Sequence, residues 1–308
     1  MPRIWLRIGM QKTGTTAVQS WLSENQDPLR DRGLLYYRPS AKKSCSGPLV
    51  QALADGPTAH QPMLAQLVDA IETCPTDVRD VLISSENFSV HAPQMARPLL
   101  EALEGYDLRI LVWLRRQDMF AEALLKQWIK WNGNKAQNVN AAMARLIRPL
   151  LDYDQLLTSW QTTFPQATIL PQIYGEHLPE KPGPDSIAAL LNAMDLGHLI
   201  PKDSAARRSN VSPQAELVNL YKTLEHPMRV RRANRELMKR HPDGFAGRAD
   251  LFTPDERAKI LADYAPSNAR LCAQWFPERS HLFDPDTPYT DTSNADAVTA
   301  FRKIYDTL

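Results

Sequence analysis

Residues 3–19 read RIWLRIGMQKTGTTAVQ, and this stretch decides which fold the chain can adopt. It opens as a short apolar run, turns through Gly9 and Gly14, and continues into a pattern that predicts a helix. A strand, a tight loop and a helix N-terminus in this order form a cradle for an anion, because backbone N–H groups and the positive end of the helix dipole point at one ligand. We therefore expect the backbone of Lys12–Thr16, with the hydroxyls of Thr15 and Thr16, to bind a phosphate group.

The position of the lysine separates this loop from the Walker A loop of ATPases and kinases. Gly9 and Gly14 have the Walker spacing, but Thr15 stands where that motif has its lysine, and the lysine lies inside the loop at Lys12. A displaced lysine implies a phosphate partner other than that of the Walker loop. The alternative interpretation, a glycine turn with a solvated lysine, does not account for the flanking strand and helix.

Short apolar runs alternate with helical patterns over the first 175 residues. Because such runs are typical of strands buried on both faces, they predict a parallel sheet flanked by helices, an α/β fold. The expected strands are Ile4–Ile8, Leu34–Tyr37, Asp80–Ser84, Leu108–Leu114 and Ala167–Leu170 with Ile173, and a helix is expected over Tyr153–Phe164.

No strand pattern follows residue 200, and the C-terminal portion is predicted to be helical. The expected helices are 212–225, 229–240, 254–276 and 293–305, with Ser212–Pro213 and Thr253–Pro254 as helix starts. The proline-rich stretches 179–184 and 285–288 indicate loops rather than linkers. We expect one domain over residues 1–308, with an α/β core in 1–175 and mainly helical elements in 176–308.

Three polar features follow predicted strands, at the edge where parallel sheets bind ligands. They are the Lys12 loop, the Glu86 region and the pair Arg115–Arg116. The helix dipole disfavours cations at a helix start, so we expect at least one of these arginines to bind an anion. Glu86 can be a general base; its position alone favours a helix-capping or ion-paired role.

The composition limits the function classes. A net charge of +1 excludes an overall nucleic-acid-binding or membrane-binding signature, but local basic patches remain possible. One such patch is Arg229–Arg240, which we interpret as a solvated helix face or as a basic wall for an anionic ligand. Trp128 and Trp131 are expected in the core or a pocket wall. The three cysteines are scattered and form no CxxC pair, which is typical of a reducing compartment. The sequence also contains no apolar run of 18 residues and no signal peptide pattern, so we expect a cytoplasmic protein without a transmembrane segment. The histidines and cysteines form no metal-binding motif.

Several segments together resemble the sulfotransferase family that uses 3′-phosphoadenosine 5′-phosphosulfate (PAPS), in particular its bacterial, Golgi-like branch of carbohydrate sulfotransferases. The segments are IGMQKTGTT (8–16), similar to the family's 5′-phosphosulfate loop, and LRRQDMFAEALLKQWIK (114–130), similar to its 3′-phosphate segment, with weaker support from ISSENF (83–88), LDYDQLLTSWQTTF (151–164) and YAPSNARLCAQWF (264–276). The resemblance implies a fold of the P-loop-containing nucleotide-binding type, in which residues 1–175 are the nucleotide-binding core and 176–308 supply acceptor-side elements.

The resemblance also implies roles for individual residues. Lys12 would contact the 5′-phosphosulfate and stabilise the leaving group, Thr13, Gly14, Thr15 and Thr16 would hold the 5′-phosphate, and Arg115 would bind the 3′-phosphate. Ala123 stands where the family has a serine, so one hydrogen bond worth about 0.5–1.5 kcal/mol is missing from the nucleotide site, unless Arg116, Lys130 or the basic run offsets it. Glu86 would be the catalytic base, with His91 as its substitute.

The implied reaction is the transfer of a sulfuryl group from PAPS to a hydroxyl or amine of a small-molecule or glycan acceptor, without a metal ion. Two alternatives stay open. A P-loop kinase would need a lysine after Gly14 and an aspartate at a strand end, and a non-catalytic relative that binds adenosine 3′,5′-bisphosphate (PAP) would agree with Ala123. The sequence gives no nucleic-acid partner, no acceptor identity and no oligomeric state.

Overall fold

The computed structural model describes residues 1–91, 93–175, 186–201, 215–241, 251–284 and 295–308. The chain forms two compact units. The first comprises Met1–Arg115 and Tyr153–Ser209, and the second comprises Arg116–Asp152 and Asn210–Leu308. The expected organisation as one domain, with its two parts meeting near residue 175, stays a prediction.

The first unit is built on a five-stranded, all-parallel sheet in the order β2-β3-β1-β4-β5. This confirms the predicted α/β fold, and each expected strand lies within two residues or so of its observed bounds. The strands are β1 Arg3–Arg7, β2 Leu34–Tyr37, β3 Asp80–Ser84, β4 Asp107–Leu114 and β5 Thr168–Ile173.

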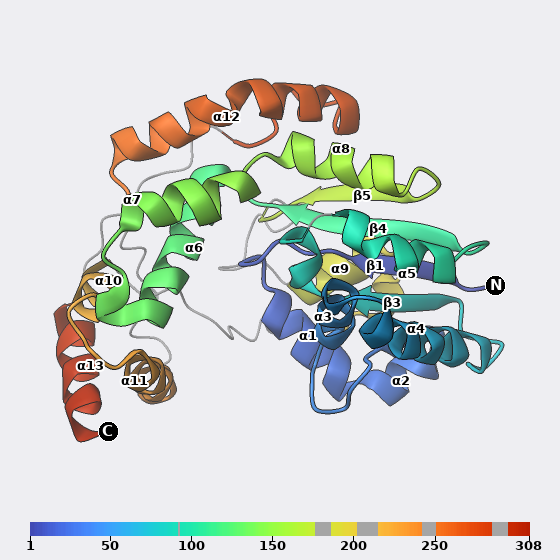
Figure 1. Ribbon diagram of the computed structural model, residues 1–308, viewed down its shortest axis with the longest axis horizontal. Helices are drawn as coiled ribbons and strands as arrows, with labels where there is room; N and C mark the ends of the chain where they lie inside the picture. Colours follow the sequence, from blue (N-terminus) through green and yellow to red (C-terminus); the bar gives the residue numbers. More distant parts are fainter. Residues whose placement is uncertain (92, 176–185, 202–214, 242–250, 285–294) are drawn as a thin grey trace. The chain divides into compact units, whose positions relative to one another are not determined.

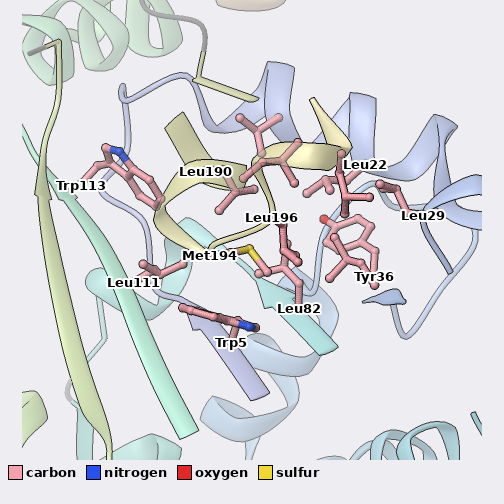
Figure 2. Packing of buried hydrophobic residues seen from close by; sticks show 14 residues of the cluster. Trp5, Leu22, Leu29, Tyr36, Leu82, Leu111, Trp113, Leu190, Met194 and Leu196 are labelled. Carbon is pink, nitrogen blue, oxygen red and sulfur yellow. The ribbon is translucent and has the colours of Figure 1, made fainter. Parts of the chain in front are cut away.

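Helices cover both faces of this sheet, which is why its central strands are continuous apolar runs. One face packs against α1 (Thr15–Glu24), α2 (Gln26–Arg30) and α9 (Ser186–Ala193), around a core that includes Trp5, Leu82 and Leu111 (Figure 2). On the other side lie α3 (Gly47–Asp55), α4 (Pro57–Glu72) and α5 (Arg97–Ala102), and α8 (Tyr153–Thr163) runs beside β5 (Figure 1). Short 3₁₀ turns complete the unit: η1 Glu86–Ser89, η2 Pro93–Ala96 and η6 Gly197–Leu199.

The strand order places a topological switch point between β1 and β4, where the connections to the next strands run in opposite directions. The chain leaves β1 toward β2 on one side of the sheet and leaves β4 toward β5 on the other. In parallel sheets the crevice outside the carboxyl ends at such a point is the usual ligand site. The loop after β1 and Arg115 after β4 both lie there.

The second unit is helical in the part that the structure describes. Helix α11 packs against α6 and α13, and α12 packs against α6. The bounds are α6 Gln117–Asn132, α7 Val139–Ala142, α10 Ala215–Tyr221, α11 Pro227–Arg240, α12 Pro254–Trp275 and α13 Ala295–Thr307, with a π-helical turn η4 at Met143–Ile147 and 3₁₀ turns η3 Gly133–Lys135 and η5 Arg148–Leu150.

These helices confirm the helical C-terminal portion. The predicted start at Thr253–Pro254 is correct: the Thr253 hydroxyl accepts from the N–H of Glu256, whose carboxylate accepts from the N–H of Thr253. The predicted start at Ser212–Pro213 and the loops 179–184 and 285–288 lie outside the described residues. Across the described ranges, none of the helices combines the length and the apolar character needed to cross a membrane.

Candidate anion-binding and catalytic site

The loop after β1 has an unusual backbone. Gly9, Lys12 and Gly14 all have positive φ angles, of 73°, 63° and 76°. Glycine adopts this left-handed region readily, whereas a residue with a side chain such as Lys12 is destabilised there by roughly 1–2 kcal/mol. The loop is held from inside, because the buried Thr13 hydroxyl donates to the carbonyl of Met10 at 2.7 Å. A strained residue in a braced loop is typical of a ligand site.

Helix α1 begins directly from this loop at Thr15. Its N-cap is Gly14, so it has no side-chain cap, and its first turn contains no acidic residue. The first N–H groups of any helix lack intrahelical acceptors, and an anion can satisfy them. Thr15 is buried and Thr16 is exposed. The loop therefore has the features expected of a phosphate cradle, with Thr13 bracing it through its hydroxyl.

Gly9 brings this loop into contact with Glu86. A Cβ atom added at Gly9 would lie 2.8 Å from Cα and 3.0 Å from Cβ of Glu86, so only glycine fits between the two segments. The close approach follows from the β1–β3 pairing, in which Arg7 lies opposite Ser84 and the N–H of Ser85 donates to the carbonyl of Arg7. Glu86 therefore lies beside the loop, as its strand-end position predicted.

The contacts of Glu86 are few, and both roles expected for it stay predictions. Ser85, not Glu86, caps the turn η1, since the Ser85 hydroxyl accepts from the N–H of Asn87. Glu86 takes part in none of the ion pairs among the described residues. Its Oε2 accepts from the Nε2 amide of Gln19, on α1, at 2.9 Å. The Glu86 side chain therefore does not cap η1, and its half-buried carboxylate is hydrogen-bonded to a neutral donor.

Arg115 connects the end of β4 to the same loop. Its Nη1 donates to the carbonyl of Lys12 at 2.8 Å, and its guanidinium lies over the ring of Tyr174, 5.6 Å from the centroid. The hydroxyl of Tyr153 donates to the carbonyl of Arg115 at 2.6 Å. The contact with Lys12 O brings two of the three predicted strand-end features together at the switch point.

Arg7 is a site residue that the sequence reasoning missed. It is the last residue of β1, only 1% exposed, and its guanidinium lies over Trp113 and donates through Nη1 to Ser84 Oγ at 3.4 Å. Its Nε has no hydrogen-bond partner in the structure. Burial lowers the pKa of Arg7 to about 10, although the charge of Glu86 opposes this shift. Arg7 therefore remains cationic at neutral pH and interacts with Glu86. The only feature of the sequence that could have identified Arg7 as a site residue is the presence of an arginine in an otherwise apolar strand.

Two more residues of the first unit contact the site. Gln19 lies one turn after Thr15 on the buried side of α1 and donates to Glu86. A glutamine at this position of a helix does not by itself indicate a functional role. Ser186, at the start of α9, lies against the loop: a Cβ on Gly14 would be 2.1 Å from its hydroxyl oxygen. No spacing rule links residues so far apart in the chain. His91, the expected substitute base, is exposed in the segment after η1.

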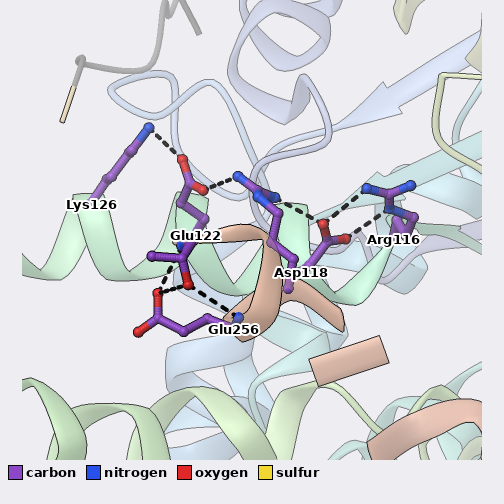
Figure 3. Close-up of polar contacts among 7 residues, drawn as sticks. Arg116, Asp118, Glu122, Lys126 and Glu256 are labelled. Atoms are coloured by element: carbon purple, nitrogen blue, oxygen red, sulfur yellow. Dashed lines mark hydrogen bonds and ion pairs between the residues drawn. The ribbon is translucent and has the colours of Figure 1, made fainter. Parts of the chain in front are cut away.

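Other expected site residues belong to the second unit. Arg116 binds Asp118 with both Nε and Nη2, at 2.8 and 2.9 Å, and its Nη1 donates to the carbonyl of Asp284. Asp118 is fully buried and also accepts from Arg257 at 2.8 Å (Figure 3). Burial would raise the pKa of Asp118, but the hydrogen bonds from both arginines lower it. Arg116 is therefore engaged in a structural ion pair, and of the two arginines Arg115 is the better candidate for an anion.

The ion-pair network continues along α6, where Glu122 pairs with Lys126 at 2.5 Å and with Arg257 (Figure 3). Ala123, on the same helix, is buried and has no polar side-chain atom. Its membership of the nucleotide site stays a prediction. Among the residues that the structure describes, no group of three or more His, Cys, Asp or Glu side chains is arranged to hold a metal ion.

Comparison with known proteins gives little further guidance. No family model matches the chain. An uncharacterized protein of Archaeoglobus fulgidus is 25% identical over 192 residues, which is 56% of this chain. The match spans 47% of that relative, so the chain covers about half of its length.

Proposed function

We propose that this chain is a sulfotransferase that moves a sulfuryl group from PAPS to a hydroxyl or amine of a small-molecule or glycan acceptor. The fold would then be of the P-loop-containing nucleotide-binding type. One observation carries the proposal: the Arg115 guanidinium contacts the carbonyl of Lys12 at 2.8 Å, in the loop that also packs against Glu86. A phosphate cradle, a second cation and a carboxylate thus share one edge of the sheet.

A nucleotide with phosphates at both the 3′ and 5′ positions fits this arrangement. The uncapped start of α1 and the backbone of Thr13–Thr16 would bind the 5′-phosphate. Arg115 would bind the 3′-phosphate through its guanidinium group. PAPS lacks a γ-phosphate, so the Mg²⁺ site of Walker-type enzymes has no function here.

The transfer itself needs alignment and charge stabilisation more than covalent catalysis. Glu86 would accept the proton of the acceptor O–H or N–H while the acceptor atom bonds to sulfur. The bond between sulfur and the bridging oxygen of the 5′-phosphate breaks, and Lys12 would stabilise the charge that develops on that oxygen. Gln19 would orient the Glu86 carboxylate. PAP leaves, and the proton stays on Glu86 until solvent removes it.

The thiols support a proposal for the cell compartment. Cys45, Cys74 and Cys272 are free. Free thiols are typical of a reducing compartment, and we place the reaction in the cytoplasm.

Calorimetry and a transfer assay test the proposal together. We expect the full chain to bind PAP with the same affinity in EDTA and in Mg²⁺, and to bind ATP–Mg²⁺ much more weakly. Radiolabelled sulfuryl transfer from PAPS to a panel of sugars and small alcohols is expected to give a labelled product. Preference for ATP–Mg²⁺ would instead support a kinase, and PAP binding without transfer would support the non-catalytic alternative.

Glu86→Gln separates the base from the binding site. It should lower turnover by about 10²–10⁴-fold, the usual contribution of a positioned general base, and leave PAP affinity nearly unchanged. The matched control is Glu72→Gln, at an exposed carboxylate on α4, which should alter neither quantity. Equal loss of binding and turnover in Glu86→Gln would contradict the assignment of Glu86 as the base.

A further inference from the structure

Helix α11, in the second unit, has two opposite faces. Its apolar face consists of Val230, Ala233 and Leu237, all buried against neighbouring helices. Residues three, four and seven positions apart share a side of a helix. The opposite side therefore carries Met228, Arg231, Arg232, Arg235 and Lys239, all of them exposed. We call these five residues the basic face of α11.

Exposed apolar side chains lie within this basic surface. Met228 is 72% exposed, and Trp131, at the end of α6, is 49% exposed. Arg231 joins the two: its guanidinium lies over the Trp131 ring at 5.6 Å and its Nη1 contacts the sulfur of Met228 at 3.6 Å. Trp131 is therefore not a core residue, and its expected place in a pocket wall stays a prediction. Tryptophan and methionine clustered on a surface indicate an interaction site rather than a solvated face.

Among the described residues the charge of this face is compensated only in part, since the pKa of Glu236 is lowered by its hydrogen bond to Lys239 and also by the nearby charge of Arg232. Arg231, Arg232 and Arg235 take part in none of the ion pairs that the described residues form, and the Glu236 carboxylate pairs with Lys239 at 3.0 Å. Lys130, on α6, is partly buried close to Arg231. Burial lowers the pKa of Lys130, and the like charge of Arg231 lowers it further. An unbalanced group of cations of this kind favours an anionic partner.

We propose that the basic face of α11, with Trp131, docks on the surface of an anionic phospholipid bilayer. The guanidinium and ammonium groups pair with lipid phosphates, and Met228 and Trp131 enter the headgroup region, where amphipathic aromatic side chains are favoured. The apolar face of α11 stays packed in the protein, so the helix binds by its exposed side. This proposal is independent of the sulfotransferase proposal.

The two exposed apolar residues favour a bilayer over a soluble polyanion. A nucleic acid or an acidic polysaccharide would pair with the same cations, but it gains little from a methionine that is three-quarters exposed. Base stacking would need an open aromatic face, and the guanidinium of Arg231 already lies over the Trp131 ring. A bilayer accommodates both the cations and the apolar side chains.

Co-sedimentation of the full chain with vesicles tests the proposal. We expect binding to phosphatidylcholine vesicles that contain phosphatidylglycerol, with weakening in high salt, and no binding to pure phosphatidylcholine. The triple variant Arg231→Gln/Arg232→Gln/Arg235→Gln should weaken partitioning about 100-fold, at about fivefold per cation. The double variant Trp131→Ala/Met228→Ala should weaken it about tenfold.

A matched triple variant controls for net charge. Arg79→Gln/Arg97→Gln/Lys259→Gln removes three exposed cations on other segments and should leave vesicle binding within about fivefold of the parent. Equal loss in both triple variants would indicate an effect of net charge and overturn the proposal, as would a lack of preference for anionic vesicles. If the Trp131/Met228 variant bound vesicles like the parent while soluble heparin competed fully, the surface would be a polyanion site and bilayer docking would be refuted.

Discussion

Replacing Gly9 by alanine is expected to disturb Glu86 through a direct backbone collision. The added Cβ would lie 2.8 Å from Cα of Glu86 and 3.0 Å from its Cβ. The nearer obstacle is a backbone atom, so rotation of a side chain cannot relieve it, and either the loop or the end of β3 must shift. The φ angle of +73° adds the strain of a left-handed conformation.

The structure provides a control that separates these two effects. Gly105 also has a positive φ, of +87°, but an added Cβ would meet nothing within 4 Å. Gly105→Ala should therefore cost only the backbone strain, about 1–2 kcal/mol. Gly9→Ala should cost this strain plus an overpacking cost of about 1–3 kcal/mol. The effect of alanine on the unfolded chain is common to both variants and cancels in the comparison.

Urea denaturation of the two variants measures the difference, and PAP affinity and sulfuryl transfer measure its consequence. Under the proposed function Glu86 is the base, and displacement of a catalytic group by about 1 Å can lower turnover about 100-fold, so Gly9→Ala should lose turnover while Gly105→Ala retains it. If the two variants were destabilised to within about 0.5 kcal/mol of one another, the close approach of Gly9 to Glu86 would be refuted. Normal transfer by Gly9→Ala would refute the need for this approach in catalysis.

Three further predictions follow from hydrogen bonds in the two units. Gln19→Leu removes the amide that donates to Glu86 and should lower turnover about tenfold at unchanged PAP affinity, and an unchanged turnover number would leave Gln19 a structural role only. Asp118→Asn should destabilise the chain by about 3–5 kcal/mol in urea denaturation, because the weakly exposed Arg116 and Arg257 lose their shared carboxylate. Because the folded state lowers the pKa of Asp118, its stabilisation is present above the unfolded pKa, near 4, and is lost as the pH falls through the lower folded value. Denaturation midpoints between pH 2 and 6 should therefore fall less steeply for Asp118→Asn than for the parent protein.

The sequence predicted the sheet and the loop well because local rules determine both. Leu34–Tyr37 and Asp80–Ser84 are apolar runs with the length of a strand, and their observed bounds are those predicted. Gly9 and Gly14 have the positive φ angles that only glycine adopts without cost. The convergence of the Lys12 loop, Glu86 and Arg115 followed from one topological rule, that parallel strands present their carboxyl ends at a common edge.

The contacts within the site could not be predicted from the sequence, because they depend on packing between segments that are far apart in the chain. Gln19 reaches Glu86 across 67 positions of the chain, and a glutamine on a helix is most often solvated. Arg116 pairs with Asp118 two residues further along the chain, but the second arginine on this carboxylate, Arg257, belongs to α12, whose position no spacing in the sequence supplies.

Arg7 shows how the fold and the proposed chemistry depend on one another. A buried guanidinium with an unpartnered Nε is destabilising, by about 1–3 kcal/mol for the missing hydrogen bond alone, and an apolar residue would pack well between Trp113 and the end of β3. Its retention of charge, with a pKa of about 10, places a permanent cation next to Glu86 and directly before the loop. Under the proposed reaction, this cation would favour the carboxylate form of the base before an acceptor arrives. A structural role alone gives no reason for a charge at this position, whereas a site that gathers anions does.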